Sequence, residues 1–110
     1  SIDGLVYAYA HAKSLLMHAI LSFIAVVLGL FFRITLTQWS MILISLGVIL
    51  SIELLNTAIE AIVDMVTLEY NELAKIAKDC GSAATFVASL IGIIIGLVVF
   101  VPHFLEILPL

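Results

Sequence analysis

The hydrophobic positions of this chain fall into three long runs, at residues 15–32, 39–63 and 82–108. Each run is close to or longer than the roughly 20 residues that an α-helix needs to cross about 30 Å of hydrocarbon. Within the runs, Leu, Ile and Val follow one another without the alternation of polar and apolar side chains that transmembrane β-strands show. The pattern therefore predicts an all-α protein with three transmembrane helices.

The residues before the first run have a different pattern. Between residues 1 and 14, apolar side chains recur at mixed helical spacings, which is typical of a short helix lying in the membrane interface. Tyr7, Tyr9 and Trp39 are interpreted as anchors at the membrane–water boundary, and a nucleic-acid partner is not expected. Composition agrees, because 65% of the 110 residues are hydrophobic, 11% are charged and the mean hydropathy is +1.35. These values are typical of an integral membrane protein.

Four polar side chains follow one another at helical spacing in and just after the second run. Glu53, Asn56, Glu60 and Asp64 are offset by three, seven and eleven residues, so an α-helix places all four on one stripe. An ionised acid at the centre of a span costs roughly 2.5 to 3.5 kcal/mol, whereas each Leu or Ile recovers only about 0.3 to 0.6 kcal/mol. Intramembrane acids therefore indicate a functional site; the alternative is that one or both glutamates are protonated packing residues or bind donors on a neighbouring helix.

Orientation follows from the few basic residues. Lys75 and Lys78 lie in the connection at residues 64–81, Lys13 precedes the first run, and Arg33 alone follows it. Counting positive charges places the N-terminus and this connection in the cytoplasm. The apolar spacing within the connection predicts a helix or helices that extend past the membrane surface.

The end of the connection carries a second group of chemically capable residues. Lys78 and Asp79 stand directly before Gly81 and Ser82, at the cytoplasmic mouth of the third run. A lysine for phosphate, an acid for a nucleotide donor and carboxylates for Mg²⁺ are parts that phosphoryl transfer uses. Neither a Walker A pattern nor a kinase glycine loop accompanies them. The residues alone thus predict a membrane site that uses a cation.

The third run contains small residues spaced by four, at Ala84, Ala88, Gly92 and Gly96. Small side chains at this spacing let helix backbones approach closely. Packing within one subunit and packing between subunits both explain the stripe. Three helices can hide only a little polar surface, so we expect a homo-oligomer with the carboxylates sheltered between helices.

Two motifs taken together resemble the signature of the small bacterial diacylglycerol kinase and undecaprenol kinase family. The first is Glu53-Leu-Leu-Asn-Thr-Ala-Ile-Glu-Ala-Ile-Val-Asp64, and the second is Tyr70-Asn-Glu-Leu-Ala-Lys-Ile-Ala-Lys-Asp79 followed by Gly81-Ser-Ala-Ala84. The resemblance implies a homotrimer of three-span subunits with active sites shared between subunits. It also implies direct transfer of the γ-phosphate of MgATP to a lipid hydroxyl at the membrane surface, in the bacterial inner membrane with the site facing the cytoplasm.

The resemblance assigns roles position by position. Glu53 matches the general base, Glu60 matches a Mg²⁺ ligand on the nucleotide side, and Asn56 matches a polar partner in the same stripe. Lys78 and Asp79 match the nucleotide-binding pair, with Lys78 near phosphate and Asp79 near the nucleoside. Supporting or rim positions are Asp64, Glu69, Tyr70, Glu72 and Ser82.

One position departs from the family pattern. Family members commonly carry a metal-binding glutamate six residues before a histidine in the first helix, and here Ala12 stands six residues before His18. The departure removes a metal-binding carboxylate and so puts in doubt the second of the cation sites that the resemblance implies. His11 and His18 are potential substitute ligands, but a lone histidine at the edge of a span is more often a hydrogen-bonded packing residue.

Three functions remain open at this stage. A lipid kinase is preferred, with undecaprenol slightly favoured over diacylglycerol as the acceptor because Glu-Leu-Leu-Asn-Thr and Phe-Val-Pro resemble the undecaprenol-using members. A small ion-coupled transporter would use the central acids to carry protons or cations, although the Lys78–Ser82 motif argues against it. A catalytically silent relative is the third possibility, and Ala12 is its only support.

Overall fold

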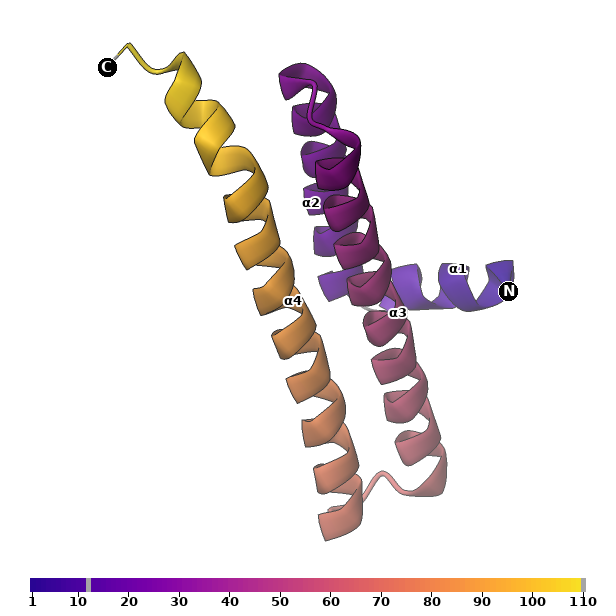
Figure 1. Cartoon of the computed structure of the whole chain (residues 1–110). Coiled ribbons are helices and arrows are strands. Elements are labelled where there is room, and N and C mark those ends of the chain that lie inside the picture. The colour runs from indigo at the N-terminus through magenta and orange to yellow at the C-terminus, as the bar shows by residue number, and fades with distance from the viewer. Residues whose placement is uncertain (12, 110) are drawn as a thin grey trace.

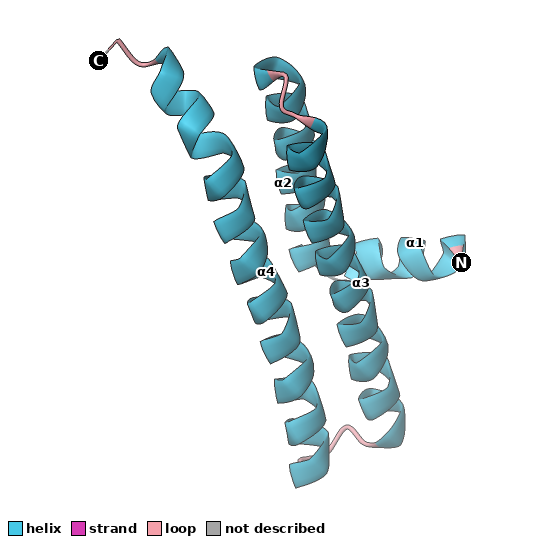
Figure 2. Cartoon of the chain, in the orientation of Figure 1, coloured by secondary structure: helices cyan, strands magenta, loops and turns pink. Residues whose placement is uncertain are grey.

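The computed structural model of this chain describes residues 1–11 and 13–109, while Ala12, Leu110 and the side chain of His11 lie outside the described part. Its helices are α1 (Ile2–His11), α2 (Lys13–Phe32), α3 (Leu36–Val66) and α4 (Glu72–Ile107), shown in Figure 1. Figure 2 shows short turns between α2 and α3 and between α3 and α4, with no strand in the described part. Three of the helices, α2, α3 and α4, are long and apolar enough to cross a membrane. The prediction of an all-α membrane protein with three spans and a short N-terminal helix is confirmed.

The three long helices differ in length. They contain 20, 31 and 36 residues, which correspond to about 30, 46 and 54 Å at 1.5 Å per residue. The apolar run at 15–32 lies within α2, whereas α4 begins well before the run at 82–108. In Figure 1, α3 and α4 continue side by side past the start of α2. Their far ends, joined by residues 67–71, therefore extend beyond what one hydrocarbon layer of about 30 Å requires.

The turn between α2 and α3 is fixed by local hydrogen bonds. Arg33 adopts a left-handed backbone conformation with φ 52°, and the Ile34 N–H donates to the Gly29 carbonyl oxygen at 3.2 Å, which is the closing bond of a Schellman motif. Thr35 then caps α3, because its Oγ1 accepts from the Gln38 N–H at 3.1 Å while Gln38 Oε1 accepts from the Thr35 N–H at 3.0 Å. This reciprocal capping box ends one span and starts the next within a few residues.

The opposite turn, between α3 and α4, has its own caps. The Thr67 N–H donates to the Val63 carbonyl oxygen at the end of α3, and Asn71 Oδ1 accepts from the Ala74 N–H at 3.1 Å at the start of α4. Glu72 lies in the first turn of α4, where a negative charge is favoured by the helix dipole. The connection predicted as helical past the membrane surface is thus the end of α3, a short capped turn and the start of α4.

The best-packed part of the bundle lies near the α2–α3 turn. Gly29 accommodates the Trp39 ring, since a Cβ at residue 29 would lie 2.6 Å from the ring atom Cη2. Phe32 and His103 stack there with ring centroids 5.3 Å apart. The buried cluster at this end consists of Ile34, Ile42, Val99 and Phe100.

The small-residue stripe of α4 is used partly within the subunit. Gly92 lies against α3, where a Cβ would be 2.5 Å from Ile49 Cδ1 and 3.2 Å from Ser45 Oγ. Ala88 is buried, whereas a Cβ on Gly96 would meet nothing within 4 Å. Close approach of α3 and α4 at Gly92 accounts for one glycine of the GxxxG pair.

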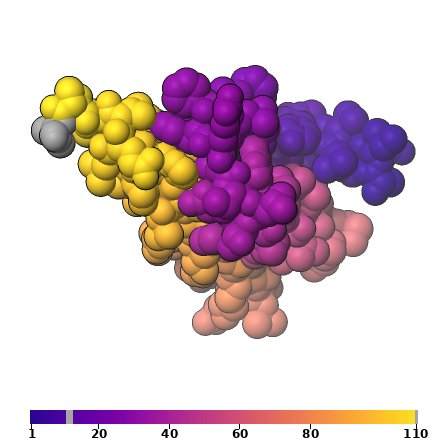
Figure 3. All heavy atoms as spheres, turned by 45° about the horizontal axis from the view of Figure 1, so that its top comes forward, coloured from indigo at the N-terminus to yellow at the C-terminus, as the bar shows by residue number. Residues whose placement is uncertain are grey.

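Helix α1 projects sideways from the bundle instead of running along it, as Figures 1 and 3 show. Only 1% of Ala8 is exposed, because this residue packs where α1 meets the bundle. Between α1 and α3 lies an open, mainly apolar groove of about 800 Å³, with Leu5 and Tyr7 on one side and Leu50 and Leu54 on the other. The direction of α1 is that of a helix lying in a membrane interface.

Candidate functional site at a buried carboxylate

Glu53 is the buried acid of the polar stripe. It lies in α3 with 4% of its surface exposed. Its Oε2 accepts a hydrogen bond from Ser14 Oγ at 3.1 Å, and its Oε1 lies 3.1 Å from His18 Nδ1. Both partners come from the first two turns of α2, so the carboxylate faces the N-terminal end of that helix. A buried carboxylate needs such partners, because an unpaired charge away from water is strongly unfavourable.

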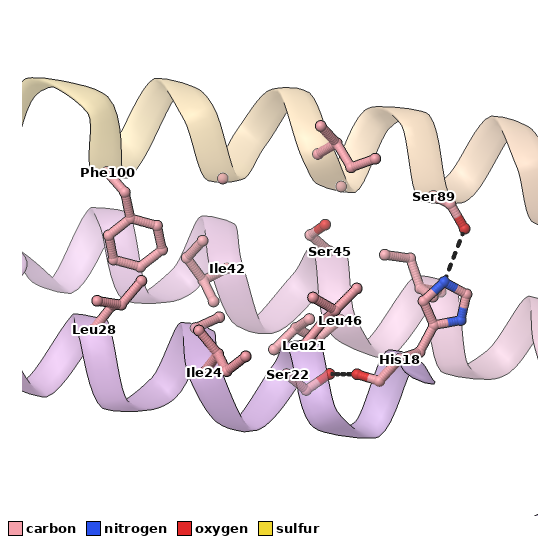
Figure 4. A pocket seen from close by; sticks show the side chains of 15 residues that line it. His18, Leu21, Ser22, Ile24, Leu28, Ile42, Ser45, Leu46, Ser89 and Phe100 are labelled. Carbon is pink, nitrogen blue, oxygen red and sulfur yellow. Dashed lines mark hydrogen bonds between the residues drawn. The ribbon is translucent and has the colours of Figure 1, made fainter. Parts of the chain in front are cut away.

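His18 continues these contacts to the third long helix. Its Nε2 lies 3.2 Å from Ser89 Oγ in α4, as Figure 4 shows. At Nδ1 the separation from Glu53 is that of an ion pair, but the ring N–H direction is not aligned for a hydrogen bond in this conformation. Side chains of α2, α3 and α4 therefore meet around one carboxylate and one imidazole.

An apolar groove opens beside this polar group. It encloses about 240 Å³ among α2, α3 and α4. In Figure 4 it extends from His18 and Ser89 at one end to Leu28 and Phe100 at the other, with Ile42 and Leu46 between them. His18, which lines one end of the groove, also contacts Glu53, the only buried acid in the described part of the chain.

Asn56 and Glu60 form the middle of the stripe. Asn56 Nδ2 lies 3.4 Å from Glu60 Oε1, one turn further along α3, and Glu60 is exposed. Asn56 Oδ1 is buried against the backbone of Gly81 in α4 and has no hydrogen-bond partner among the described residues. Because the Glu60 side chain is exposed, its carboxylate is accessible to a ligand from outside the chain.

The far end of the stripe forms a polar cleft with the start of α4. Asp64 Oδ1 accepts from Lys78 Nζ at 2.7 Å, and Asp79 Oδ2 accepts from Lys75 Nζ at 2.6 Å. These four side chains line a cleft of about 260 Å³ at the α3–α4 turn. Lys78 and Asp79, predicted as a nucleotide-binding pair, thus each have a different partner in the same cleft. Glu69 and Tyr70 also line it.

The remaining rim residues have lesser contacts. Ser82 Oγ donates to the Asp79 carbonyl oxygen at 3.1 Å, and Glu72 is exposed in the first turn of α4. Glu53 and Asp64 are eleven residues apart, so the stripe covers about 16 Å along α3. The structure consequently divides the stripe into a buried carboxylate, an exposed acid with its amide, and a salt-bridged cleft.

Comparison with known proteins places this geometry in a family. The model of "Prokaryotic diacylglycerol kinase" matches residues 1–100. The chain belongs to the prokaryotic diacylglycerol kinase family. It is 39% identical over 85 residues to undecaprenol kinase from Bacillus subtilis, 31% over 104 residues to diacylglycerol kinase from Escherichia coli K12, and 29% over 106 residues to diacylglycerol kinase from Synechocystis.

The coverage of these relatives differs. The aligned residues make up 77%, 94% and 96% of this chain and 69%, 85% and 61% of the respective relatives. The chain thus spans about three fifths of the Synechocystis protein and more of the other two. All three relatives carry names of lipid kinases, so this chain is a member of a family of membrane lipid kinases.

Kinases use a metal ion together with their nucleotide. The side chains of this site can therefore be compared with the ligands that such an ion requires. No group of three His, Cys, Asp or Glu side chains that could hold a metal occurs among the described residues. Mg²⁺, however, keeps several waters and is usually bound by one or two carboxylates together with substrate phosphates. The exposed carboxylate of Glu60 fits that requirement. Ala12, where the resemblance to the family leads us to expect a glutamate, lies outside the described residues.

Sequence reasoning missed three residues of this site. Ser14 and Ser89 were not singled out, and His18 was expected to be a hydrogen-bonded packing residue. His18 does form a hydrogen bond, with Ser89, and its Nδ1 also lies 3.1 Å from the proposed base Glu53. No spacing rule links the three, because they lie on different helices. One feature of the sequence could have pointed to His18. A buried carboxylate requires hydrogen-bond donors, and His18 is among the few side chains at the edge of a span that can donate.

Proposed function

We propose that this chain transfers the γ-phosphate of MgATP to the hydroxyl of a membrane lipid alcohol, with undecaprenol preferred over diacylglycerol. The observation that carries the proposal is the buried Glu53 carboxylate, held by Ser14 and His18 beside an apolar groove in a member of this family. A carboxylate in such a position can accept the proton of an alcohol whose hydrocarbon tail stays in the membrane.

In the proposed mechanism, Glu53 is the general base. It accepts the proton of the lipid hydroxyl as the hydroxyl oxygen attacks the γ-phosphorus, and the bond to the β–γ bridging oxygen breaks to release ADP. Phosphoryl transfer depends mainly on positioning and charge neutralisation. Glu53 therefore has to be held in place, and its contacts with two turns of α2 do this.

The nucleotide is proposed to occupy the polar cleft at the α3–α4 turn. Lys78 would exchange its contact with Asp64 for phosphate oxygens, and Asp79 would accept from the nucleoside end. Glu60, between the cleft and Glu53 along α3, is the proposed carboxylate ligand of Mg²⁺. The metal would supply charge neutralisation on the phosphates. Asn56, which lies 3.4 Å from Glu60, would orient that carboxylate.

The proposed assembly is a homotrimer with active sites shared between subunits. Only 11% to 17% of the most apolar window of each long helix is buried within one chain. The exposed Glu60 and the absence of a three-ligand cluster among the described residues are also compatible with a site completed by a neighbouring subunit. The proposed location is the bacterial inner membrane, with Lys75 and Lys78 on the cytoplasmic side.

The direct test is transfer of labelled γ-phosphate from MgATP to undecaprenol and, separately, to diacylglycerol in mixed micelles. The chain as written is compared with Glu53→Gln, which removes the base, and with Ala12→Glu, which restores the family's acidic position. Labelled lipid from the unaltered chain, and none above background from Glu53→Gln, is the expected result. An inactive unaltered chain would overturn the proposed function; activity in Ala12→Glu alone would then identify a disabled kinase.

A further inference from the structure

His18 connects the three membrane-length helices at the proposed base, and the proposed mechanism uses only its contact with Glu53. On α2, it places Nδ1 3.1 Å from Glu53 Oε1 in α3 and Nε2 3.2 Å from Ser89 Oγ in α4. Ser14, one turn earlier on α2, holds the other carboxylate oxygen at 3.1 Å. These contacts form a continuous series from Ser14 through Glu53 and His18 to Ser89.

We propose that His18 is a positioning residue for Glu53, with its ring orientation held by Ser89. The proposal rests on the proposed function, because it assigns to His18 a part in holding the base of that reaction. It also extends the site to α4 at a point well away from the nucleotide-binding pair.

The tautomer follows from the hydrogen-bonding capacity of each group. An ionised carboxylate only accepts, so Nδ1 must carry the proton to stabilise Glu53. A neutral imidazole then has an acceptor at Nε2, and the Ser89 hydroxyl can donate to it. The carboxylate of Glu53 therefore favours the tautomer that presents an N–H to it, and the Ser89 hydroxyl, which can donate or accept, is compatible with that tautomer. The Nδ1–H direction is not aligned with the carboxylate in this conformation, and catalytic contacts are often poorly aligned before substrate binds.

The two contacts on Glu53 also determine which way the base faces. With Ser14 on Oε2 and His18 on Oε1, both oxygens are held toward α2, and each keeps a lone pair for the substrate hydroxyl. Glu60 lies seven residues further along α3, about 10 Å away along the helix axis. Ser14 and His18 thus hold the carboxylate toward α2, and His18 itself lines one end of the apolar groove.

The test uses variants that remove the contacts one at a time. His18→Leu removes both ring nitrogens, His18→Asn keeps an N–H donor near the Nδ1 position, and Ser89→Ala removes only the contact at Nε2. Ser22→Ala is the matched control, because Ser22 is one turn from His18 and its hydroxyl donates only to the His18 backbone carbonyl, at 2.7 Å. For each variant, kcat and the KM values for MgATP and lipid are measured in mixed micelles, along with the thermal unfolding temperature.

For His18→Leu we expect kcat to fall about 10- to 100-fold, less than the 10²- to 10⁴-fold effect of a general base, with both KM values within about twofold. His18→Asn should recover most of the loss, Ser89→Ala should lower kcat by a smaller factor, and Ser22→Ala should leave it unchanged. An unchanged kcat in His18→Leu would overturn the proposal. So would equal losses in His18→Asn and His18→Leu at unchanged unfolding temperatures, since a positioning donor must be rescued by a donor.

A second measurement does not depend on turnover. The ¹⁵N chemical shifts of His18 in labelled protein show which ring nitrogen carries the proton. We expect the Nδ1–H tautomer in the unaltered chain, because the Glu53 carboxylate can only accept. An Nε2–H tautomer in the unaltered chain would overturn the proposal even if the lipid is phosphorylated. If the unaltered chain phosphorylates no lipid, the proposed function fails and the catalytic role of His18 fails with it, whatever the tautomer.

Discussion

The side-chain amide oxygen of Asn56 lies so close to the backbone of Gly81 that a Cβ on residue 81 would overlap it. Asn56 belongs to α3 and Gly81 to α4, so the absence of a side chain at residue 81 is what allows the two helices to approach beside the polar stripe. Gly81 is buried, and the Asn56 Oδ1 atom is buried with it. This contact fixes how the start of α4, with the proposed nucleotide-binding residues, sits relative to the acids of α3.

Replacing Gly81 with alanine should destabilise the protein and lower activity. We expect a loss of about 1 to 3 kcal/mol, typical of overpacking, because the new methyl group must displace the Asn56 amide or separate the helices. Gly47→Ala is the matched control, since a Cβ there would meet nothing within 4 Å. That substitution should stabilise the helix by up to about 1 kcal/mol. Thermal unfolding in detergent measures both changes.

A double variant separates the contact from other effects. With Asn56→Ala in place, the nearest side-chain atom left for a Cβ on residue 81 would be the Cβ of residue 56, at 3.9 Å, which is ordinary van der Waals contact. Gly81→Ala should therefore cost little in the Asn56→Ala background. If Gly81→Ala is equally harmful in both backgrounds, the overlap with Asn56 is not the reason for the glycine.

Glu53 and Asp79 should affect different steps. Glu53→Gln removes the proposed base and should lower kcat about 10²- to 10⁴-fold with little change in MgATP affinity. Asp79→Asn should weaken MgATP affinity about tenfold or more, because a hydrogen bond to a charged group contributes roughly 1.5 to 3 kcal/mol. Nucleotide titration and initial rates distinguish these outcomes. Equal effects of both variants on affinity alone would contradict this division of roles.

Lys78 should act on the nucleotide and contribute little to folding. Its salt bridge with Asp64 is solvent-exposed on both sides, and such pairs contribute little to stability. Lys78→Met should raise the KM for MgATP about tenfold or more, because a charge-assisted contact with phosphate is lost. Arg33→Gln is the control, as it removes a positive charge at the opposite end of the spans. A similar rise in KM in both variants would indicate a general effect of net charge.

Glu60 should determine the requirement for Mg²⁺. Glu60→Gln should increase the Mg²⁺ concentration for half-maximal activity about tenfold, while the unfolding temperature changes little because this side chain is exposed. Glu106→Gln serves as the control, since Glu106 is an exposed acid at the other end of α4. Rates are measured against free Mg²⁺ at saturating ATP. An unchanged Mg²⁺ dependence in Glu60→Gln would remove Glu60 from the metal site.

The sequence by itself determined the architecture of this protein. Three apolar runs of spanning length require three helices, because backbone groups in hydrocarbon must be satisfied within the helix. The 3.6-residue period was enough to place Glu53, Asn56, Glu60 and Asp64 on one stripe. Because ionised side chains are costly in hydrocarbon, the stripe also had to have interaction partners or a functional role.

Periodicity could not show that the members of the stripe have different surroundings. Glu53 is 4% exposed while Glu60, on nearly the same face, is exposed. The reason is where α2 begins along the bundle. Its first two turns lie beside Glu53, whereas α3 continues past the start of α2. The partners Ser14, His18 and Ser89 are likewise decided by how the helices pack. Residues 39 and 71 positions apart can be brought into contact only by the tertiary structure, because local spacing carries no information about which helix turns will meet.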